Sequence, residues 1–248
     1  MKNVWIIILL LVSACSVGFE DSGFSDGGVS QGGSLSRFAI VGDYLYIVND
    51  FRLVPVDITS LDNPIKLETQ DLGVGIETIF PYNDLLYIGS NSAVYIYDIQ
   101  DPANPRFLSM HSHATGCDPV VVSGNYAYVT LREGVSCNSF FNINVLEVLD
   151  VSDVRNPSLI NTLEMSSPRG LGIGCNNKLF VCEGEGGIVQ FDLTNPASPL
   201  FEARYDQFPA EDVIIKDDLV ISTGIEGVYQ YSCAEDSLVL LSYIPFSL

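Results

Sequence analysis

The sequence predicts an all-β protein: a five-bladed β-propeller whose blades are four-stranded antiparallel sheets. One recurring phrase, an apolar strand followed by Asp and a short loop closed by Pro, lies at 54–64, 95–105, 147–157 and 189–199. A second phrase, a turn followed by an apolar strand, precedes each of these copies and also precedes a fifth, degraded copy of the first phrase. The second phrase is centred on five residues that we call the marker residues: Tyr46, Tyr87, Tyr128, Phe180 and Ile221. The marker residues are 41, 41, 52 and 41 positions apart. A period near 41 with several short strands per unit is typical of propeller blades.

Each unit divides into four short strands, named A to D from the propeller centre outwards. In the second unit we expect them at 77–82, 85–90, 93–98 and 105–110, because short apolar segments there are bounded by Asn, Asp, Gly and Pro. The corresponding blades cover 35–70, 75–110, 117–165, 168–206 and 210–244. The fifth unit has Ser232 where the others have Asp, and no Asn-Pro follows. The sequence therefore leaves open whether five blades close the ring.

The recurring Asp residues have two interpretations, a calcium site or a turn. Calcium needs six to eight oxygens converging on one point, whereas these Asp residues belong to different blades. An Asp at the end of a strand can instead accept a hydrogen bond from the backbone two residues on. We therefore predict such turns at Asp57, Asp98, Asp150 and Asp192. The Pro residues that close the loops should begin strand D, an edge strand that tolerates a missing N–H: Pro64, Pro105, Pro157 and Pro199.

These motifs resemble a known family. The stretch CDPVVVSGNYAYVT at 117–130 and the stretch NVLEVLDVSDVRNP at 144–157 are similar to LVIVD-repeat proteins, and the likeness extends over roughly 37–245. The resemblance implies a β-propeller on an exported or surface protein. It implies no particular biochemical activity.

The N-terminus indicates export. Residues 1–15 carry Lys2, an apolar run too short to span a bilayer, and then small residues, as in a secretory signal. Val12-Ser13-Ala14-Cys15 resembles the bacterial lipobox, and this resemblance implies that Cys15 carries lipid. Ser16 follows Cys15, which implies sorting to the outer membrane of a Gram-negative envelope. The lipoprotein would then face either the periplasm or the cell surface. An ordinary signal peptide with a chance Cys is the alternative. Residues 16–34, rich in Gly, Ser and acids, should form a flexible tether before a propeller domain at 35–248.

Charge limits the class of partner. The net charge is −20 with 11 Lys and Arg residues, which argues against nucleic acid as a partner and against anionic lipid as a partner of the folded domain. The only membrane contact that we expect is the lipid anchor, and the domain should be a monomer. Solubility or a saline habitat would equally account for the acidity.

The cysteines indicate a disulfide in the third unit. If Cys15 carries lipid, five of the six cysteines remain, and an exported protein permits them to pair. The third unit has about 11 extra residues, 133–143, between its strands B and C, and Cys137 lies in this insert. Cys117 begins strand A of the same unit and lies on the same face, so we predict a Cys117–Cys137 disulfide. Cys175 and Cys182 fall on opposite faces and should not pair with each other.

One face of the propeller collects the candidate binding residues. The connections from D to the next A and from B to C lie together on this face, which we call the upper face. It includes Glu77, Asp118, Glu211, Asp212 and Arg169 near the channel mouth, and Phe140 and Phe141 in the insert. Crowded carboxylates there would favour a divalent cation or a basic partner. The alternative is that these loops are simply solvated and that each Arg pairs with an acid. The side chains of Phe140 and Phe141 would either form a contact patch for a partner or anchor the insert to the blade.

His111 and His113 form a His-x-His pair on the same face, and with Asp118 they are weak candidates for a metal site. The sequence lacks the nucleophile elbow, the phosphate loop and the dinucleotide fingerprint. We therefore expect no catalytic residues and no obligatory cofactor, in a lipid-anchored envelope module that binds a protein or a small ligand. A metal-dependent hydrolase with its site at the acidic mouth, or a structural part of an envelope assembly, are the alternatives.

Overall fold

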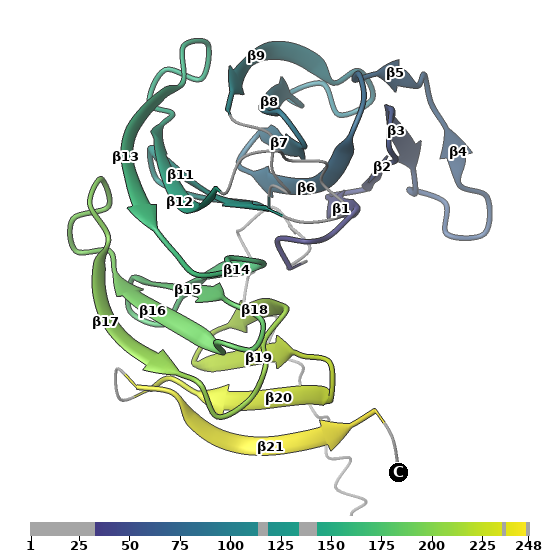
Figure 1. Cartoon of the computed structure of the whole chain (residues 1–248). Helices are drawn as coiled ribbons and strands as arrows, with labels where there is room; N and C mark the ends of the chain where they lie inside the picture. The colour runs from purple at the N-terminus through teal and green to yellow at the C-terminus, as the bar shows by residue number, and fades with distance from the viewer. Residues whose placement is uncertain (1–32, 114–118, 134–142, 235–236, 247–248) are drawn as a thin grey trace, which may run out of the picture.

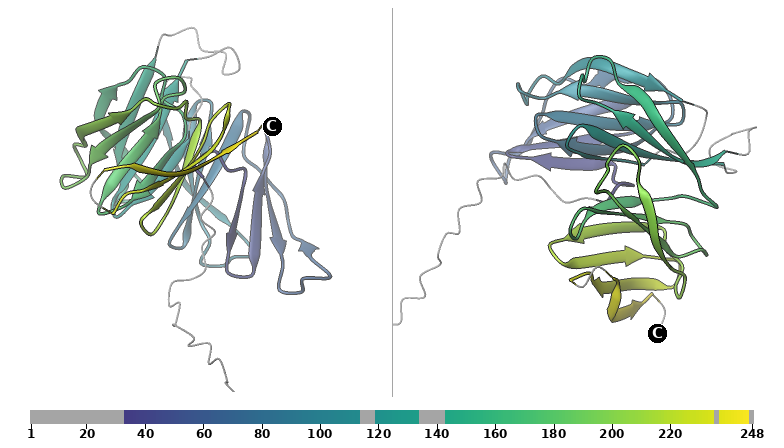
Figure 2. Two further views of the ribbon diagram at one scale, coloured as in Figure 1. Left: turned by 90° about the horizontal axis from the view of Figure 1, so that it is seen from below. Right: turned by 90° about the vertical axis from the view of Figure 1, so that its left-hand side faces the viewer.

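The computed structural model describes residues 33–113, 119–133, 143–234 and 237–246, and within them every regular element is a β-strand. Five antiparallel sheets are arranged as propeller blades around a common centre (Figures 1 and 2). The predicted fold class is confirmed. No described segment forms a helix able to cross a membrane.

The strands follow the predicted order A to D in every blade. Blade 1 consists of β1 (Phe38–Val41), β2 (Tyr44–Val48), β3 (Arg52–Asp57), β4 (Ile65–Lys66) and β5 (Gln70–Asp71). Blade 2 consists of β6 (Ile76–Tyr82), β7 (Leu85–Ser90), β8 (Ala93–Asp98) and β9 (Arg106–Ser112). Its bounds agree with the predicted ranges to within two residues. In blade 1, β4 and β5 both pair with β3 and replace one continuous strand D.

The remaining blades have four strands each. Blade 3 contains β10 (Val120–Ser123), β11 (Tyr126–Arg132), β12 (Asn144–Asp150) and β13 (Ser158–Glu164). Blade 4 contains β14 (Leu171–Gly174), β15 (Lys178–Cys182), β16 (Ile188–Asp192) and β17 (Leu200–Tyr205). Blade 5 contains β18 (Asp212–Lys216), β19 (Leu219–Thr223), β20 (Gly227–Ser232) and β21 (Val239–Pro245).

The Asp-to-Pro phrase forms the predicted turn in the four blades that carry it. The carboxylates of Asp57, Asp98, Asp150 and Asp192 accept the N–H two residues on, at 2.9, 2.8, 2.8 and 2.5 Å. The pKa of each carboxyl lies below its usual range. The leading cause is the Thr59 hydroxyl at Asp57, the Gln100 N–H at Asp98, the Ser152 hydroxyl at Asp150 and the Lys178 ammonium at Asp192. The closing Pro directly precedes strand D in each blade. The recurring Asp is thus a structural residue.

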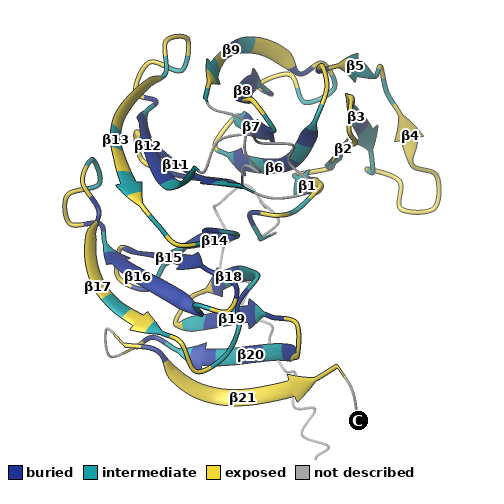
Figure 3. Ribbon diagram, viewed as in Figure 1, coloured by how far each residue is buried: buried dark blue, intermediate teal, exposed yellow. Residues whose placement is uncertain are grey.

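The core is divided among the contacts between consecutive blades. Four clusters of buried apolar side chains lie between blades 1 and 2, 2 and 3, 3 and 4, and 4 and 5. The marker residues Tyr46, Tyr87, Tyr128 and Phe180 are almost completely buried in these four clusters. Figure 3 shows the same distribution, with buried inner strands and an exposed outer β21. Each of the first four blades therefore inserts its marker residue against the next blade.

Two marker tyrosines also hydrogen-bond across the blade contact. The Tyr46 hydroxyl donates to the Pro102 carbonyl in blade 2 at 2.9 Å, and the Tyr128 hydroxyl donates to the Pro196 carbonyl in blade 4 at 2.9 Å. Both acceptors lie in the Asp-to-Pro loop of the following blade. The two recurring phrases of the sequence thus meet in space, between neighbouring blades.

The array of five blades is open. The strongest contacts between inner strands join β1 to β6, β6 to β10, β10 to β14 and β14 to β18, each to the next blade. Among the described residues, no core cluster joins blade 5 to blade 1. Figure 1 shows these two blades apart, with β3 and β4 on one side of the opening and β20 and β21 on the other. This resolves the question of ring closure that the degraded fifth repeat left open.

A short N-terminal segment, Gly33–Arg37, crosses the centre of the array. Ser34 is buried; its hydroxyl donates to Asp212 Oδ1 at 3.3 Å and accepts the Leu171 N–H at 2.7 Å. The Ser36 carbonyl accepts the Ile79 N–H at 2.9 Å. We call this segment the strap, because it joins blade 1 to blades 2, 4 and 5. Composition alone assigned Ser34 to the tether, but the folded part already includes it.

A disulfide joins blades 4 and 5. Cys175, in the A–B turn of blade 4, is bonded to Cys233, which directly follows β20, across 58 residues of sequence. Cys182 is a buried free thiol. The prediction that Cys175 and Cys182 do not pair is confirmed. Both partners of the predicted Cys117–Cys137 disulfide lie outside the described residues.

Candidate functional site

The mouth of the central channel on the upper face brings charged groups of opposite sign together. Arg169, just before blade 4, forms an ion pair with Glu211, just before blade 5. The Arg169 backbone is fixed by Thr130, whose hydroxyl donates to the Arg169 carbonyl at 2.7 Å, and by the Cys182 carbonyl, which accepts the Arg169 N–H at 2.8 Å. Two residues that the sequence placed at the mouth are therefore neighbours, as paired charges.

A second arginine lies close to this pair. Arg132 ends β11 at the base of the 133–143 insert, and burial together with the nearby Arg169 lowers its pKa. Glu211 and Glu77 act in the opposite direction and stabilise its charge. We call Arg132, Arg169, Glu211 and Glu77 the mouth cluster. The described carboxylates of the mouth thus lie beside arginines, as in the alternative in which each Arg pairs with an acid.

Asp212 is separated from this cluster and serves the strap. Its carboxylate accepts hydrogen bonds from Ser34 and from the backbone of the strap, while its burial raises the pKa of the carboxyl to about 6. Gly170 and Gly33 both lie against it: an added Cβ on Gly170 would come 2.8 Å from the Asp212 Cα. Asp212 therefore holds the N-terminal segment in place.

The two histidines have a partner that the sequence did not indicate. His111 lies next to the end of β9, strand D of blade 2, and its pKa is lowered by burial and, to a lesser extent, by the neighbouring His113. Glu147, on β12 of blade 3, is buried, which raises its pKa, and His113 partly offsets this effect. His113 and Glu147 thus form an electrostatic contact between blades 2 and 3. Within the described segments, no group of three His, Cys, Asp or Glu side chains is placed to share a metal ion.

Several predicted site residues lie outside the described residues. These are Asp118, Phe140 and Phe141, together with Cys117 and Cys137. The divalent cation and the aromatic contact patch therefore stay predictions.

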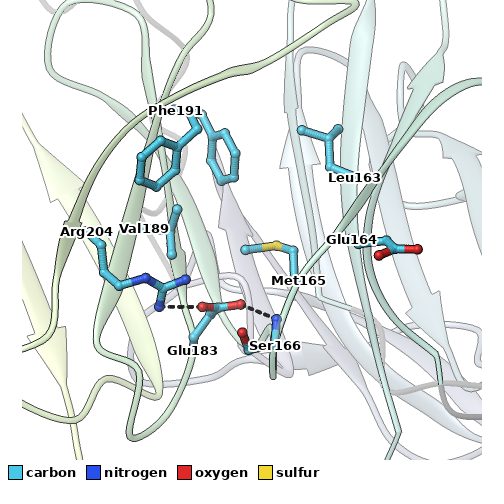
Figure 4. Close-up of a pocket in the computed structure, with 9 residues that line it drawn as sticks. Leu163, Glu164, Met165, Ser166, Glu183, Val189, Phe191 and Arg204 are labelled. Carbon is cyan, nitrogen blue, oxygen red and sulfur yellow. Dashed lines mark hydrogen bonds and ion pairs between the residues drawn. The ribbon is translucent and has the colours of Figure 1, made fainter.

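A pocket of about 420 Å³ that no sequence pattern indicated lies on the upper side, between the outer strands of blades 3 and 4 (Figure 4). Leu163, Met165, Val189 and Phe191 form apolar walls around a polar base. At the base, the buried Glu183 carboxylate accepts the Ser166 N–H at 2.6 Å and lies 2.6 Å from Arg204 Nη1. Arg204 also donates to the Gly186 carbonyl at 2.9 Å. The pocket has one neutralised ion pair below an apolar rim.

Comparison with known proteins agrees with the fold. A functionally unknown protein from Desulfotomaculum acetoxidans DSM 771 superposes with a TM-score of 0.70 at 12% identity, over 86% of this chain and 70% of that one. A periplasmic gluconolactonase of Pseudomonas aeruginosa gives a TM-score of 0.65 at 11% identity, over 82% and 68%. A Lactobacillus plantarum protein gives 0.62 at 15% identity, over the same shares. At these identities the likeness shows the fold, and no reaction carries over. No curated protein matches the sequence.

The fold and the repeat define the class of protein, a β-propeller of five repeated blades. The model of the LVIVD repeat matches residues 32–69 and 117–135, within blades 1 and 3. The chain is thus a β-propeller in which two segments match the LVIVD repeat, the family that its motifs resemble.

Proposed function

We propose that this chain is a lipid-anchored β-propeller of the bacterial cell envelope and acts as a binding module through its upper face. The mouth cluster carries the proposal. Two arginines are held near each other among carboxylates, at the point where the longest insertion of the repeat begins. A mixed cluster of this kind offers directional contacts to a polar ligand or to a protein surface with complementary charges.

The strap supports an orientation for this face. It is bound by residues at the starts of β14 and β18, so the chain enters the folded part at the upper face, next to the mouth cluster. Residues 16–32 separate it from Cys15, and a fully extended chain of this length reaches at most about 60 Å. With lipid on Cys15, the binding face lies within that distance of the membrane that holds the anchor.

The test is affinity capture from envelope extract with the full chain as bait, quantified by mass spectrometry. Arg132→Ala and Arg169→Ala should each reduce capture of the specific ligand at least tenfold, since a charge-assisted contact is worth about 1.5–3 kcal/mol. Arg52→Ala, which removes an exposed arginine paired with Asp71 at the rim of blade 1, is the matched control and should bind normally. Equal capture by all three variants would exclude the mouth cluster.

Lipidation has its own test. Globomycin should block processing of the precursor, and Cys15→Ser should release the chain from the membrane fraction. Normal processing with globomycin would leave an ordinary signal peptide and remove the anchor from the proposal.

A further inference from the structure

The two ends of the open array leave two blade faces without a neighbour. On blade 1, the strand pairing places six apolar side chains on one face of β1–β3: Phe38, Ile40, Leu45, Ile47, Val54 and Val56. We call this set the first-blade face. On blade 5, the face that carries the marker residue includes Ile214, Leu219, Ile221, Thr223, Val228 and Gln230, together with Asp212, Lys216 and Ser232 at the strand ends; we call it the fifth-blade face. Each other pair of facing blades builds a core from the same two kinds of face.

The first-blade face lacks the cover that its counterparts have. Phe38 pairs with Ile47 in register, as Ile79 pairs with Ile88 in blade 2. Ile79 and Ile88 are buried against blade 1, whereas Phe38 is 54% and Ile47 is 37% exposed. The sequence is equally apolar at both places. The difference is the absence of a preceding blade.

The Asp-to-Pro loop of blade 1 likewise has no preceding blade packed against it. Pro102 and Pro196 offer their carbonyls to the marker tyrosine of the preceding blade. The corresponding residue in blade 1, three positions before the closing Pro, is Leu61, which is 90% exposed. An acceptor position of the repeat is therefore open to solvent.

The fifth-blade face presents the complementary half. Its marker residue, Ile221, is only partly buried, whereas the four other marker residues are buried. Gln230 occupies the position of Gln190, which lies on the covered face of blade 4. Blade 5 is thus built to meet a following blade.

The opening is about two blades wide. This chain covers 70% of the Desulfotomaculum acetoxidans protein and 68% of the Pseudomonas aeruginosa protein. If five units fill about seven tenths of such a chain, the remainder has room for about two more.

We propose that two further four-stranded blades of the same repeat type fill this opening. The first of them packs an apolar face on the fifth-blade face. The second packs on the first-blade face and directs a tyrosine hydroxyl at the Leu61 carbonyl. A second copy of this chain does not fit, because it brings five blades to a space for two and a further net charge of −20. This surface is separate from the mouth cluster, so either proposal stands if the other fails.

The first experiment asks whether the opening accepts two blades. A copy of residues 33–113 is appended to the full chain through a long linker with a protease site, and side-chain access is measured by hydroxyl-radical footprinting. We expect oxidation at Phe38 and Leu61 to fall at least fivefold and the two pieces to stay together after cleavage. An appended copy of residues 33–72, one blade, is the matched control and should leave Leu61 reactive. Unchanged oxidation with dissociation after cleavage would overturn the proposal.

The second experiment asks what occupies the opening in the cell. Full chain is purified from its own envelope in mild detergent and weighed by native mass spectrometry. We expect a particle heavier than this chain by at least two repeat units, in which Phe38 is protected. The protection should be lost in Ile47→Asp and in Ile221→Asp but retained in Phe107→Asp, an exposed residue on the outer β9. A particle with the mass of this chain and a reactive Phe38, a homo-oligomer, or protection kept by both end variants would each overturn the proposal.

Discussion

Tyr46 and Tyr128 each complete a contact between two blades through one hydroxyl group. The phenol ring fills the core between the blades, and the hydroxyl satisfies a Pro carbonyl of the next blade. Burial raises the pKa of both hydroxyls, so they stay protonated donors at any physiological pH. The marker position therefore combines packing with one specific hydrogen bond.

We expect Tyr46→Phe to lower the free energy of unfolding by about 0.5–1.5 kcal/mol, because the Pro102 carbonyl loses its donor. Tyr46→Leu, which also removes the ring, should cost about 3 kcal/mol or more. Urea unfolding followed by fluorescence measures both. If Tyr46→Phe has the wild-type midpoint, the hydroxyl has no structural role.

Asp212 should make stability depend on pH. Its pKa of about 6 in the folded chain exceeds the usual 3.8, so between pH 4 and pH 6 the folded state keeps a proton that the unfolded state releases. The free energy of unfolding therefore falls as pH rises through this window, by about 3 kcal/mol at most. Thermal melts of Asp212→Asn should show a flatter profile between these pH values. Asp218 has an exposed carboxylate in a turn, so Asp218→Asn should keep the wild-type dependence of stability on pH. The same dependence in wild type, Asp212→Asn and Asp218→Asn would contradict the role of Asp212.

At the scale of elements, the sequence predicted the repeat well and the departures from it poorly. The strands of blade 2, the Asp turns and the Pro starts followed from local rules, because alternation and turn chemistry act over a few residues. The Cys175–Cys233 bond needed the spatial relation between consecutive blades: an A–B turn of one blade and the end of strand C of the next lie on one side. The Glu183–Arg204 pair and the Ser34–Asp212 contact depend on side-chain positions that no spacing in the sequence encodes.

Loss of the Cys175–Cys233 disulfide should destabilise the end of the array. Chain entropy for 58 intervening positions gives about 4 kcal/mol, so Cys175→Ala with Cys233→Ala should lower the melting temperature markedly. Calorimetry of the double variant against wild type measures the effect. A melting temperature within one degree of wild type would show that the bond is dispensable.

Peptide mapping without reduction examines both disulfides. We expect one linked pair from Cys175 and Cys233, a free Cys182, and a second linked pair from Cys117 and Cys137. Finding Cys117 and Cys137 as free thiols would remove the prediction made from the third repeat.

At the scale of the whole molecule, the repeat gave the number of blades but not the curvature of the array. Blade number follows from counting marker residues, whereas the angle between blades follows from how bulky side chains pack in four separate cores. The strap links blade 1 to blades 4 and 5, where a fifth blade contact is missing, and the disulfide reinforces the contact between blades 4 and 5. The exposed first-blade face and the charged mouth cluster are the two separate surfaces to which we assign binding in our proposals.

Hydroxyl-radical footprinting of the full chain, purified alone, tests the central claim of an open five-bladed array most directly. The structure predicts that Tyr46, Tyr87, Tyr128 and Phe180 are protected, while Phe38 and Leu61 are oxidised as readily as the exposed Phe107. Protection of Phe38 and Leu61 to the level of Tyr46, in a particle with the mass of one chain, would show a closed ring and contradict the account.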